Sequence, residues 1–249
     1  MLKEQNIFIG TSGWSYDHWI GKFYPREMER TDWIKHLAEH FNSVELNMSF
    51  YRFPFKNMLK GWYNKLPDNF QMTMKANRNI THRKRLQNID ELLLRFYNLA
   101  SVLDDKLGCI LFQTPPSFKK NDSNLERLEN FLESLKGNYK NVFEFRHKSW
   151  WSDEIYALLQ KYSSTFCIVS GLNMPDTMPV TSNTVYLRFH GPGQPYASKY
   201  SPKQIKEWTE KIKALDENEN VENIYCYFNN DSEGYAIDNA MDLQKALRQ

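Results

Sequence analysis

Eight short apolar runs alternate with longer stretches of helical repeat along the 249 residues of this chain, and no other sequence feature limits the fold as strongly. The apolar runs predict strands at Ile7–Thr11, Ser43–Met48, Phe70–Lys75, Gly108–Gln113, Asn141–Arg146, Ser164–Val169, Thr184–Phe189 and Asn223–Asn229. Even alternation of this kind is typical of a TIM-type (β/α)8 barrel, in which parallel strands close into a ring inside a ring of helices. We therefore expect a single α/β domain spanning residues 1–249.

The helical stretches repeat their apolar residues every three or four positions, and several begin with a residue that favours a helix start. Helices are expected at about Asp32–Phe41, Lys56–Lys65, Glu91–Asp104, Asn124–Lys136, Asp153–Tyr162 and Pro202–Leu215, and after Tyr235. The expected N-caps are Thr31, Asp90, Ser123, Ser152 and Ser201. The segment Ser170–Asn183 contains two prolines and predicts a loop in place of the sixth helix.

A doubly wound sheet uses the same alternation and is the competing architecture. Folds of that type that bind dinucleotides carry GxGxxG after the first strand, whereas Gly10–Tyr16 reads GTSGWSY and does not lead into a helix. The side-chain phases of the strands also favour the barrel, because one phase is apolar throughout and the other turns polar toward the C-terminal end. The polar phase comprises Glu45, Asn47, Thr73, Lys75, Gln113, Glu144, Arg146, Arg188, His190, Asn229 and Asp231. In a barrel this phase faces the lumen, so these groups should meet at the C-terminal mouth, where barrel enzymes have their active sites.

Charge and cysteine content exclude several classes of protein. Lysine and arginine number 32 against 30 aspartate and glutamate residues, a net charge of +2, so the chain as a whole gives no signal for binding polyanions. Cys109, Cys167 and Cys226 are far apart and lie inside apolar runs, which argues against a disulfide framework or a zinc site and indicates reduced thiols in the cytoplasm. No apolar run approaches the length of a membrane span.

Three cations on three strands form the predicted anion site. Arg146 follows Glu144 in the segment Phe143–Trp150, and Lys75 and Arg188 occupy matching ends of their strands. Arginine presents paired N–H groups that fit phosphate or carboxylate, so the functional interpretation is a clamp for a small anionic ligand. The alternative is an internal salt-bridge lattice in which Glu45 and Glu144 neutralise two of the three cations.

Glu144 and Glu45 are the candidates for a general base, and His190 is the candidate acid. Burial raises the pKa of a carboxyl group, whereas neighbouring arginines lower it, so the two effects compete here. A histidine at a strand end is also a common hydrogen-bonded packing residue. No cofactor is predicted. A divalent metal held by Glu45, Glu144, His190 and Asp231 is a further alternative, which the nearby cations and the lack of a ligand motif oppose.

Two loops and a group of aromatic residues should surround the mouth. The run Arg78–Arg85 is strongly basic and follows the third strand, and Gly191–Tyr196 follows the seventh, where many barrels bind phosphate through backbone amides. Trp14, Tyr16, Trp19, Trp150 and Trp151 follow the first and fifth strands. Such aromatics either stack on bases and sugars or close the barrel end by packing.

Several motifs resemble the YecE-like family, also called domain of unknown function 72. The matching segments are Gly10–Tyr16, Lys75–Arg78 with Thr81 and His82, Gln113–Phe118, Phe143–Trp150, Arg188–Gly191 and Tyr227–Asp231. The chain departs from the family pattern at Lys148, where proline is usual, and at Thr114, where leucine is commoner. The resemblance implies a TIM-barrel-like fold and supplies no established reaction.

The sequence leaves three functional hypotheses. The first is an enzyme, of the hydrolase, lyase or isomerase class, whose small anionic substrate is bound by Lys75, Arg146 and Arg188 with help from Gln113, Asn229, Asp231, Trp14 and Tyr16. The second is a nucleic-acid-binding or phosphodiester-processing protein that uses the basic loop and the rim aromatics. The third is a binding barrel without catalysis. The oligomeric state stays open.

Overall fold

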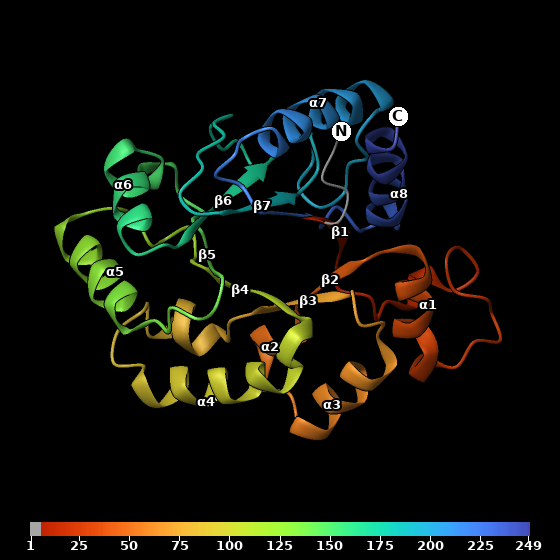
Figure 1. The fold of residues 1–249 in the computed structure, drawn as a ribbon, viewed down its shortest axis with the longest axis horizontal. Coiled ribbons are helices and arrows are strands. Elements are labelled where there is room, and N and C mark those ends of the chain that lie inside the picture. Colours follow the sequence, from red (N-terminus) through yellow and green to blue (C-terminus); the bar gives the residue numbers. More distant parts are fainter. Residues whose placement is uncertain (1–5) are drawn as a thin grey trace.

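The computed structural model describes residues 6–249, and its centre is a closed barrel of eight parallel strands in sequence order (Figure 1). The strands are β1 Ile7–Ser12, β2 Ser43–Leu46, β3 Gln71–Lys75, β4 Leu107–Gln113, β5 Asn141–Glu144, β6 Thr165–Ser170, β7 Thr184–Phe189 and β8 Asn223–Phe228. The ring closes where β8 pairs with β1, with Ile224 opposite Ile7. The predicted (β/α)8 fold is confirmed.

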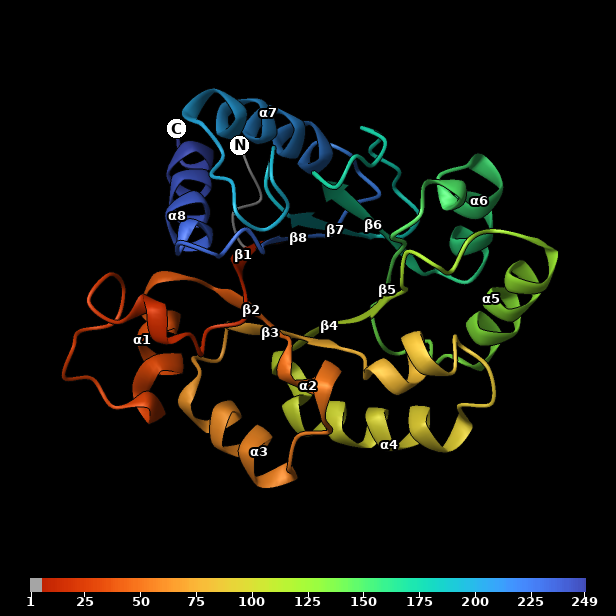
Figure 2. The same ribbon diagram turned by 180° about the vertical axis from the view of Figure 1, so that it is seen from behind.

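Helices surround the barrel on all sides in both ribbon views (Figures 1 and 2). They are α1 Trp33–His40, α2 Met48–Tyr51, α3 Lys56–Lys65, α4 Asp90–Ala100, α5 Asp122–Ser134, α6 Asp153–Lys161, α7 Pro202–Asp216 and α8 Tyr235–Leu247. Residues 171–183, all within the described part of the chain, contain no helix, which confirms the predicted loop between β6 and β7. In residues 6–249 no helix is both long and apolar enough to cross a membrane.

Several predicted element ends are wrong, most of them by one or two residues, and three of them have a visible structural reason. β2 ends at Leu46 instead of Met48 because the chain turns into the short helix α2, which the sequence did not predict. β5 ends at Glu144 instead of Arg146, and a 3-10 turn at Lys148–Trp150 follows shortly. The predicted helix Glu91–Asp104 is also too long: α4 ends at Ala100, and Asp104 has a positive φ of 42° that no α-helix accommodates.

The ring of strands lies between two apolar clusters, one outside the barrel and one in its lumen, as the side-chain phases predict. One phase packs on the helices and includes Val44, Leu46, Met72, Met74, Phe112 and Phe143. The other fills the lumen with Cys109, Leu111, Val142, Cys167, Val169, Tyr186, Tyr225 and Tyr227. All three cysteines are free and buried, and burial raises the pKa of the Cys109 thiol to about 12. The lumen is therefore a packed core beneath the charged mouth and not a channel.

Helix starts agree with the sequence at two of the five expected caps. Ser201 caps α7, and Ser152 precedes α6. The other three predictions are wrong, since Asp32, Ile89 and Asn121 hold the cap positions of α1, α4 and α5.

The two correct caps differ in their hydrogen bonds. Ser201 Oγ accepts a hydrogen bond from the Gln204 amide at 3.3 Å, and Gln204 Oε1 accepts one from the Ser201 amide at 2.9 Å, which is a complete capping box. Ser152 makes no such bond, and its hydroxyl is buried without a partner among the described residues.

Ser201→Ala is expected to cost about 1 kcal/mol of unfolding free energy, because it removes a helix cap. Ser152→Ala is the matched control and should be neutral or slightly stabilising, since it removes an unpaired buried hydroxyl. Urea denaturation of the two variants and the wild type measures both effects. Equal losses in both variants would contradict the assignment of the capping box.

Candidate functional site

A pocket with a volume of about 690 Å³ lies at the C-terminal mouth of the barrel. Small-molecule sites usually have volumes of about 300–1,000 Å³. Seven of the predicted site residues line it: Tyr16, Lys75, Gln113, Arg146, Arg188, Asn229 and Asp231. Four do not, because Glu45, Glu144 and His190 are fully buried behind this lining and Trp14 packs elsewhere. The structure thus brings seven of the eight predicted binding groups together in the pocket lining and places the predicted acid and bases directly behind that lining.

Arg188 holds the floor of the mouth together. Its two terminal nitrogens donate to separate carboxylates, one to Glu144 at 2.5 Å and the other to Glu45 at 2.6 Å, and all three side chains are fully buried. Tyr186 donates a further hydrogen bond to Glu45 at 2.6 Å. Burial opposes ionisation of Glu144, but Arg146 and Arg188 hold its pKa well below the usual value. Glu144 is therefore a permanent counter-ion and a poor base.

Arg146 links this floor to the rim of the pocket. Its Nε forms an ion pair with Glu144, and one terminal nitrogen donates to the Tyr196 hydroxyl at 2.6 Å. His190 lies between Glu144, at 3.1 Å, and the Asn229 amide, at 3.2 Å. Burial and the charge of Arg146 lower the pKa of His190 to about 3. This imidazole is neutral at ordinary pH and fixed by its neighbours, which suits a structural role better than that of a catalytic acid.

Lys75 is positioned by α2, the short helix that the sequence did not predict. Ser49 of this helix donates a hydrogen bond from its hydroxyl to the Lys75 carbonyl at 2.6 Å. The Lys75 ammonium lies 4.5 Å from the centre of the Phe50 ring, a cation–π contact, and Phe50 in turn contacts His82 edge-on. Burial and the charge of Arg188 lower the pKa of Lys75 to about 7. A lysine that titrates near neutrality at the wall of a pocket is typical of a functional site.

Asp231 is the second group in the pocket that titrates near neutrality. Trp19 donates its indole N–H to the carboxylate at 3.0 Å, and His18 Nε2 lies 3.0 Å from the other oxygen. Burial raises the pKa of Asp231 to about 6, although His18 opposes this rise. Asp231 and His18 both line the pocket, so they can exchange a proton with a bound ligand. The sequence predicted a binding role for Asp231 and gave no signal for His18.

The tryptophans after β1 and β5 close the barrel by packing and do not form a stacking platform. Trp14 is 7% exposed and meets Trp62 edge-on at 5.1 Å, so its predicted role in substrate binding is corrected. Trp19 and Trp150 are fully buried, and Trp151 packs edge-on against Phe166. Tyr16 stays at the pocket wall, where its hydroxyl donates to the Ser12 carbonyl at 2.7 Å.

The loop Gly191–Tyr196 does not form the predicted backbone phosphate cradle. The Gly191 amide donates to the Tyr200 hydroxyl at 3.1 Å, and the Gly193 amide donates to Ser198 Oγ at 2.9 Å. Both amides are therefore already satisfied within the protein. The loop instead contributes the Tyr196 ring, which lines the pocket through a side chain that is 40% exposed.

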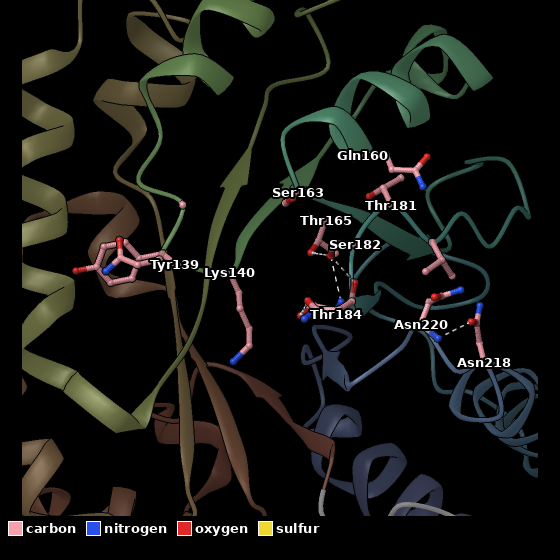
Figure 3. Close-up of a pocket in the computed structure, with 14 residues that line it drawn as sticks. Tyr139, Lys140, Gln160, Ser163, Thr165, Thr181, Ser182, Thr184, Asn218 and Asn220 are labelled. Carbon is pink, nitrogen blue, oxygen red and sulfur yellow. Dashed lines mark hydrogen bonds between the residues drawn. The ribbon is translucent and has the colours of Figure 1, made fainter.

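A second cavity of about 790 Å³ lies at the opposite end of the barrel, around the starts of β6 and β7 (Figure 3). Its polar groups largely bond to one another: Thr165 and Ser182 share a hydrogen bond of 2.8 Å, and the Thr184 amide donates to Ser182 at 3.1 Å. Barrel enzymes have their active sites at the C-terminal face, whereas residues at the N-terminal face contribute to stability. We therefore place the functional site in the smaller pocket at the mouth.

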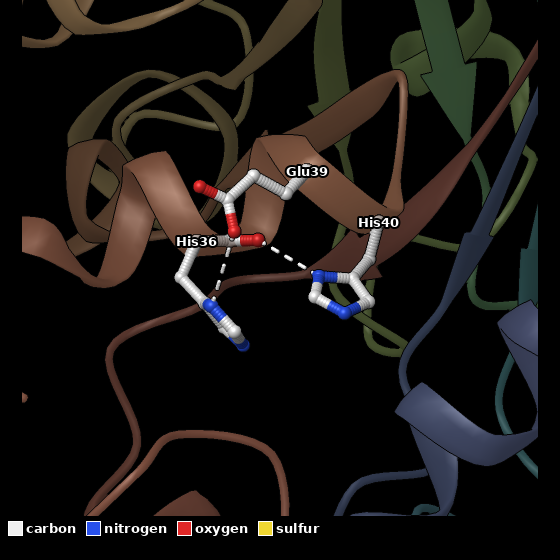
Figure 4. A group of neighbouring side chains, drawn as sticks. All are labelled: His36, Glu39 and His40. Atoms are coloured by element: carbon white, nitrogen blue, oxygen red, sulfur yellow. Dashed lines mark hydrogen bonds and ion pairs between the residues drawn. The ribbon is translucent and has the colours of Figure 1, made fainter.

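The proposed metal ligands Glu45, Glu144, His190 and Asp231 do not converge on one point. Within residues 6–249 one group has its ligand atoms close enough for a metal ion, namely His36, Glu39 and His40 on the exposed face of α1 (Figure 4). His36 Nε2 bonds to the Phe23 carbonyl at 3.0 Å, and His40 Nδ1 bonds to the His36 carbonyl at 2.9 Å. α1 ends just before β2 begins, so this group lies toward the end of the barrel away from the mouth.

The sequence of residues 8–249 matches the family described as "Protein of unknown function DUF72". The chain belongs to the DUF72 family. This confirms the resemblance inferred from the motifs. The DUF72 chain is 26% identical to UPF0759 protein YunF of Bacillus subtilis, over 97% of this chain and 94% of YunF. It is 29% identical to UPF0759 protein YecE of Escherichia coli K12, over 59% of this chain and 50% of YecE.

Solved structures of DUF72 proteins have the same fold. One from Thermotoga maritima is 30% identical, covers 98% of this chain and 100% of its own length, and superposes with a TM-score of 0.88. Another, from Enterococcus faecalis, is 22% identical and covers 98% of this chain and 96% of its own, with a TM-score of 0.85. These similarities establish the DUF72 barrel and give no reaction.

Four residues that line the pocket of this DUF72 chain were not predicted from the sequence: His18, Phe50, Tyr51 and Ser232. Phe50 and Tyr51 belong to α2, which is too short to produce a helical repeat. His18 reaches the pocket through a contact with Asp231, 213 positions away in the sequence, which no local pattern reveals. His82 and Tyr196 also line the pocket and were noted only as parts of loops.

Proposed function

We propose that this DUF72 protein is an enzyme that acts on a small compound carrying a carboxylate or phosphate group, bound in the mouth pocket. The observation that carries this proposal is the ammonium group of Lys75. The charges of Arg146 and Arg188 are offset by Glu45 and Glu144, whereas Lys75 has no ion pair within residues 6–249. A pocket wall with one uncompensated cation attracts an anion.

The proposed roles differ from those expected from sequence. Lys75 and Arg146 contact the anionic group, and Arg188 supports them from the floor. Asp231 and His18 take the place of Glu144, Glu45 and His190 as proton-transfer groups, because both line the pocket and burial raises the pKa of Asp231 to about 6. Proton transfer of this kind serves hydrolases, lyases and isomerases. No cofactor is included in this proposal.

Arg146→Met is expected to weaken the binding of small anions about tenfold or more, the usual effect of losing one charge-assisted hydrogen bond. A thermal-shift series with sulfate, phosphate and pyruvate measures the affinity, since a ligand of the folded state raises the melting temperature. Arg30→Met is the control, because Arg30 pairs with Asp17 on the exposed surface. Unchanged affinity in the Arg146 variant would remove this residue from the site.

Nucleic-acid binding is the second candidate function, because of the position of the basic loop. His82 lines the pocket, and the neighbouring side chains of Arg83, Lys84 and Arg85 are exposed. The burial of Trp14, Trp19 and Trp150 removes three of the five aromatic stacking surfaces that this function was expected to use.

Affinity for a short oligonucleotide should fall steeply as salt is raised if this second function is correct, because bound phosphates release counter-ions. Fluorescence anisotropy over a salt series measures the slope. Replacing Arg83, Lys84 and Arg85 together by glutamine should flatten it. A weak, salt-independent signal would exclude this candidate.

Saturable binding of small anions without turnover of any compound would instead favour a binding barrel. We place the protein in the cytoplasm, on the basis of its three buried thiols.

A further inference from the structure

Lys75 differs from every other cation of the mouth in its partners. Arg146 and Arg188 form ion pairs with Glu144, and Arg188 forms a second one with Glu45. Each guanidinium is thereby held charged and directed at a carboxylate. Within the described residues the nitrogen of Lys75 makes no hydrogen bond or ion pair and lies over the face of the Phe50 ring, so its lone pair is not engaged once the proton leaves.

The surroundings of Lys75 favour the neutral amine. Burial, followed by the charge of Arg188, lowers the pKa of this side chain to about 7, so a substantial fraction is deprotonated at neutral pH. The side chain still reaches the pocket wall, where a ligand can approach it. An amine that is both uncharged and accessible is a nucleophile, and lysines next to other cations in partly dry pockets act in this way in imine-forming enzymes.

We propose that Lys75 forms an imine with the carbonyl carbon of a small oxo compound whose carboxylate or phosphate group faces Arg146. This inference rests on the anion site proposed above and adds the second functional group of the substrate. The pocket volume of about 690 Å³ is ample for a compound of a few carbon atoms.

The step balances without an oxidant or reductant. The amine lone pair forms a C–N bond while the C=O π electrons move to oxygen, and transfer of one proton from nitrogen to this oxygen gives the neutral carbinolamine. A second proton is delivered to the hydroxyl, which leaves as water while the nitrogen lone pair forms the C=N bond, and the product is the protonated imine. Asp231 lines the same pocket with a pKa of about 6 and can deliver and accept these protons.

The imine explains why an active site would combine these residues. Once protonated, it withdraws electrons from the adjacent carbon, so that a C–H or C–C bond at this carbon breaks more easily. Arg146 holds the anionic end of the substrate, and Asp231 or His18 moves the proton. The residues therefore suit a lyase or isomerase that acts next to a carbonyl group, and they narrow the reaction class left open above.

Reductive trapping tests this inference directly. The purified full chain is incubated with sodium cyanoborohydride and either pyruvate, which carries a carboxylate, or dihydroxyacetone phosphate, which carries a phosphate. Intact-mass and peptide mass spectrometry then locate the secondary amine. We expect one adduct per chain, on the peptide that contains Lys75, and protection of this lysine by added sulfate. The compound that reacts identifies which of the two anionic groups the site prefers.

Two variants control the experiment. Lys75→Arg keeps a positive charge but cannot form an imine, so the adduct should disappear while sulfate still raises the melting temperature. Lys161→Arg changes an exposed lysine that pairs with Glu129 at 3.0 Å, and it should be trapped like the wild type.

The remaining outcomes distinguish a failure of the imine proposal from a failure of the anion site on which it rests. No adduct on Lys75 with either compound, together with stabilisation by sulfate, would overturn the imine and leave the anion site in place. Adducts spread evenly over exposed lysines would also overturn it. Absence of both the adduct and any effect of sulfate would overturn the anion site as well.

Discussion

Replacing Arg188 by methionine is expected to destabilise the barrel by about 3–5 kcal/mol, or to prevent folding, because it leaves two buried carboxylates without their shared counter-ion. Glu45 and Glu144 are both fully buried, and each accepts a hydrogen bond from a different nitrogen of this guanidinium. Glu144 keeps Arg146 as a partner in the variant, whereas among residues 6–249 Glu45 keeps only the hydrogen bond from the Tyr186 hydroxyl. The unpaired charge of Glu45 is thus the main source of the loss. Urea denaturation of the variant and the wild type measures it.

A second variant keeps this prediction testable if the first does not fold. Glu45→Gln combined with Arg188→Met removes the buried carboxylate together with its counter-ion, and it should recover a large part of the lost stability. Arg146→Met is the matched single change at the rim, and its cost should be smaller because Arg188 still neutralises Glu144. If the unfolding free energy of Arg188→Met lies within about 1 kcal/mol of the wild-type value, the two carboxylates are not ionised and the assigned charge balance is wrong.

The result also decides between the two interpretations that the sequence left open for this cluster. An arginine whose loss unfolds the protein is a structural member of a salt-bridge lattice, and the lattice accounts for Arg188 and both glutamates. The clamp interpretation then applies to Lys75 and Arg146 alone. That outcome would support each interpretation for different residues of the same set.

The fold could be predicted because its signals are local. Each strand is a short apolar run, and the two-residue period that places Phe143 against the helices also places Glu144 in the lumen. The alternation of strands and helices then selects the barrel. The loop Ser170–Asn183 was predicted for the same reason, since its prolines act on their immediate neighbours.

The sequence predicted which residues belong to the site but not which of them pair, because the paired residues are far apart in the sequence. Glu45 and Arg188 lie 143 positions apart, and Arg188 reaches both glutamates only because the barrel closes. The phase of a strand predicts that a side chain faces the lumen but not how deep it lies. Glu144 at the end of β5 is consequently buried, whereas Lys75 at the end of β3 reaches the pocket. The predicted binding role of Trp14 was wrong for a similar reason, since a residue after a strand can turn outward to pack on a helix.

Lys75→Met is expected to lower the affinity for sulfate about a hundredfold and to remove its pH dependence, because it deletes the uncompensated charge of the pocket. In the wild type, the anion favours the ammonium form of Lys75, so binding raises the pKa of this group and takes up a proton. Affinity is therefore full below pH 7 and falls by up to about tenfold per pH unit as the pH rises above the free-state pKa of about 7. Sulfate is the appropriate probe because it stays a dianion throughout this range.

The variant Lys75→Arg distinguishes the effect of the positive charge on sulfate affinity from the effect of its titration. Its guanidinium stays protonated, so sulfate should still bind, with an affinity that no longer changes between about pH 6 and about pH 9. Loss of binding in Lys75→Met will not reflect unfolding. The lowered pKa means that the folded state disfavours the ammonium group below about pH 7, so the variant should be at least as stable as the wild type there. Isothermal titration at several pH values measures all three proteins. A pH slope that persists in both variants would assign the titration to Asp231 and would leave Lys75 as a charge that packs on Phe50 without binding a ligand.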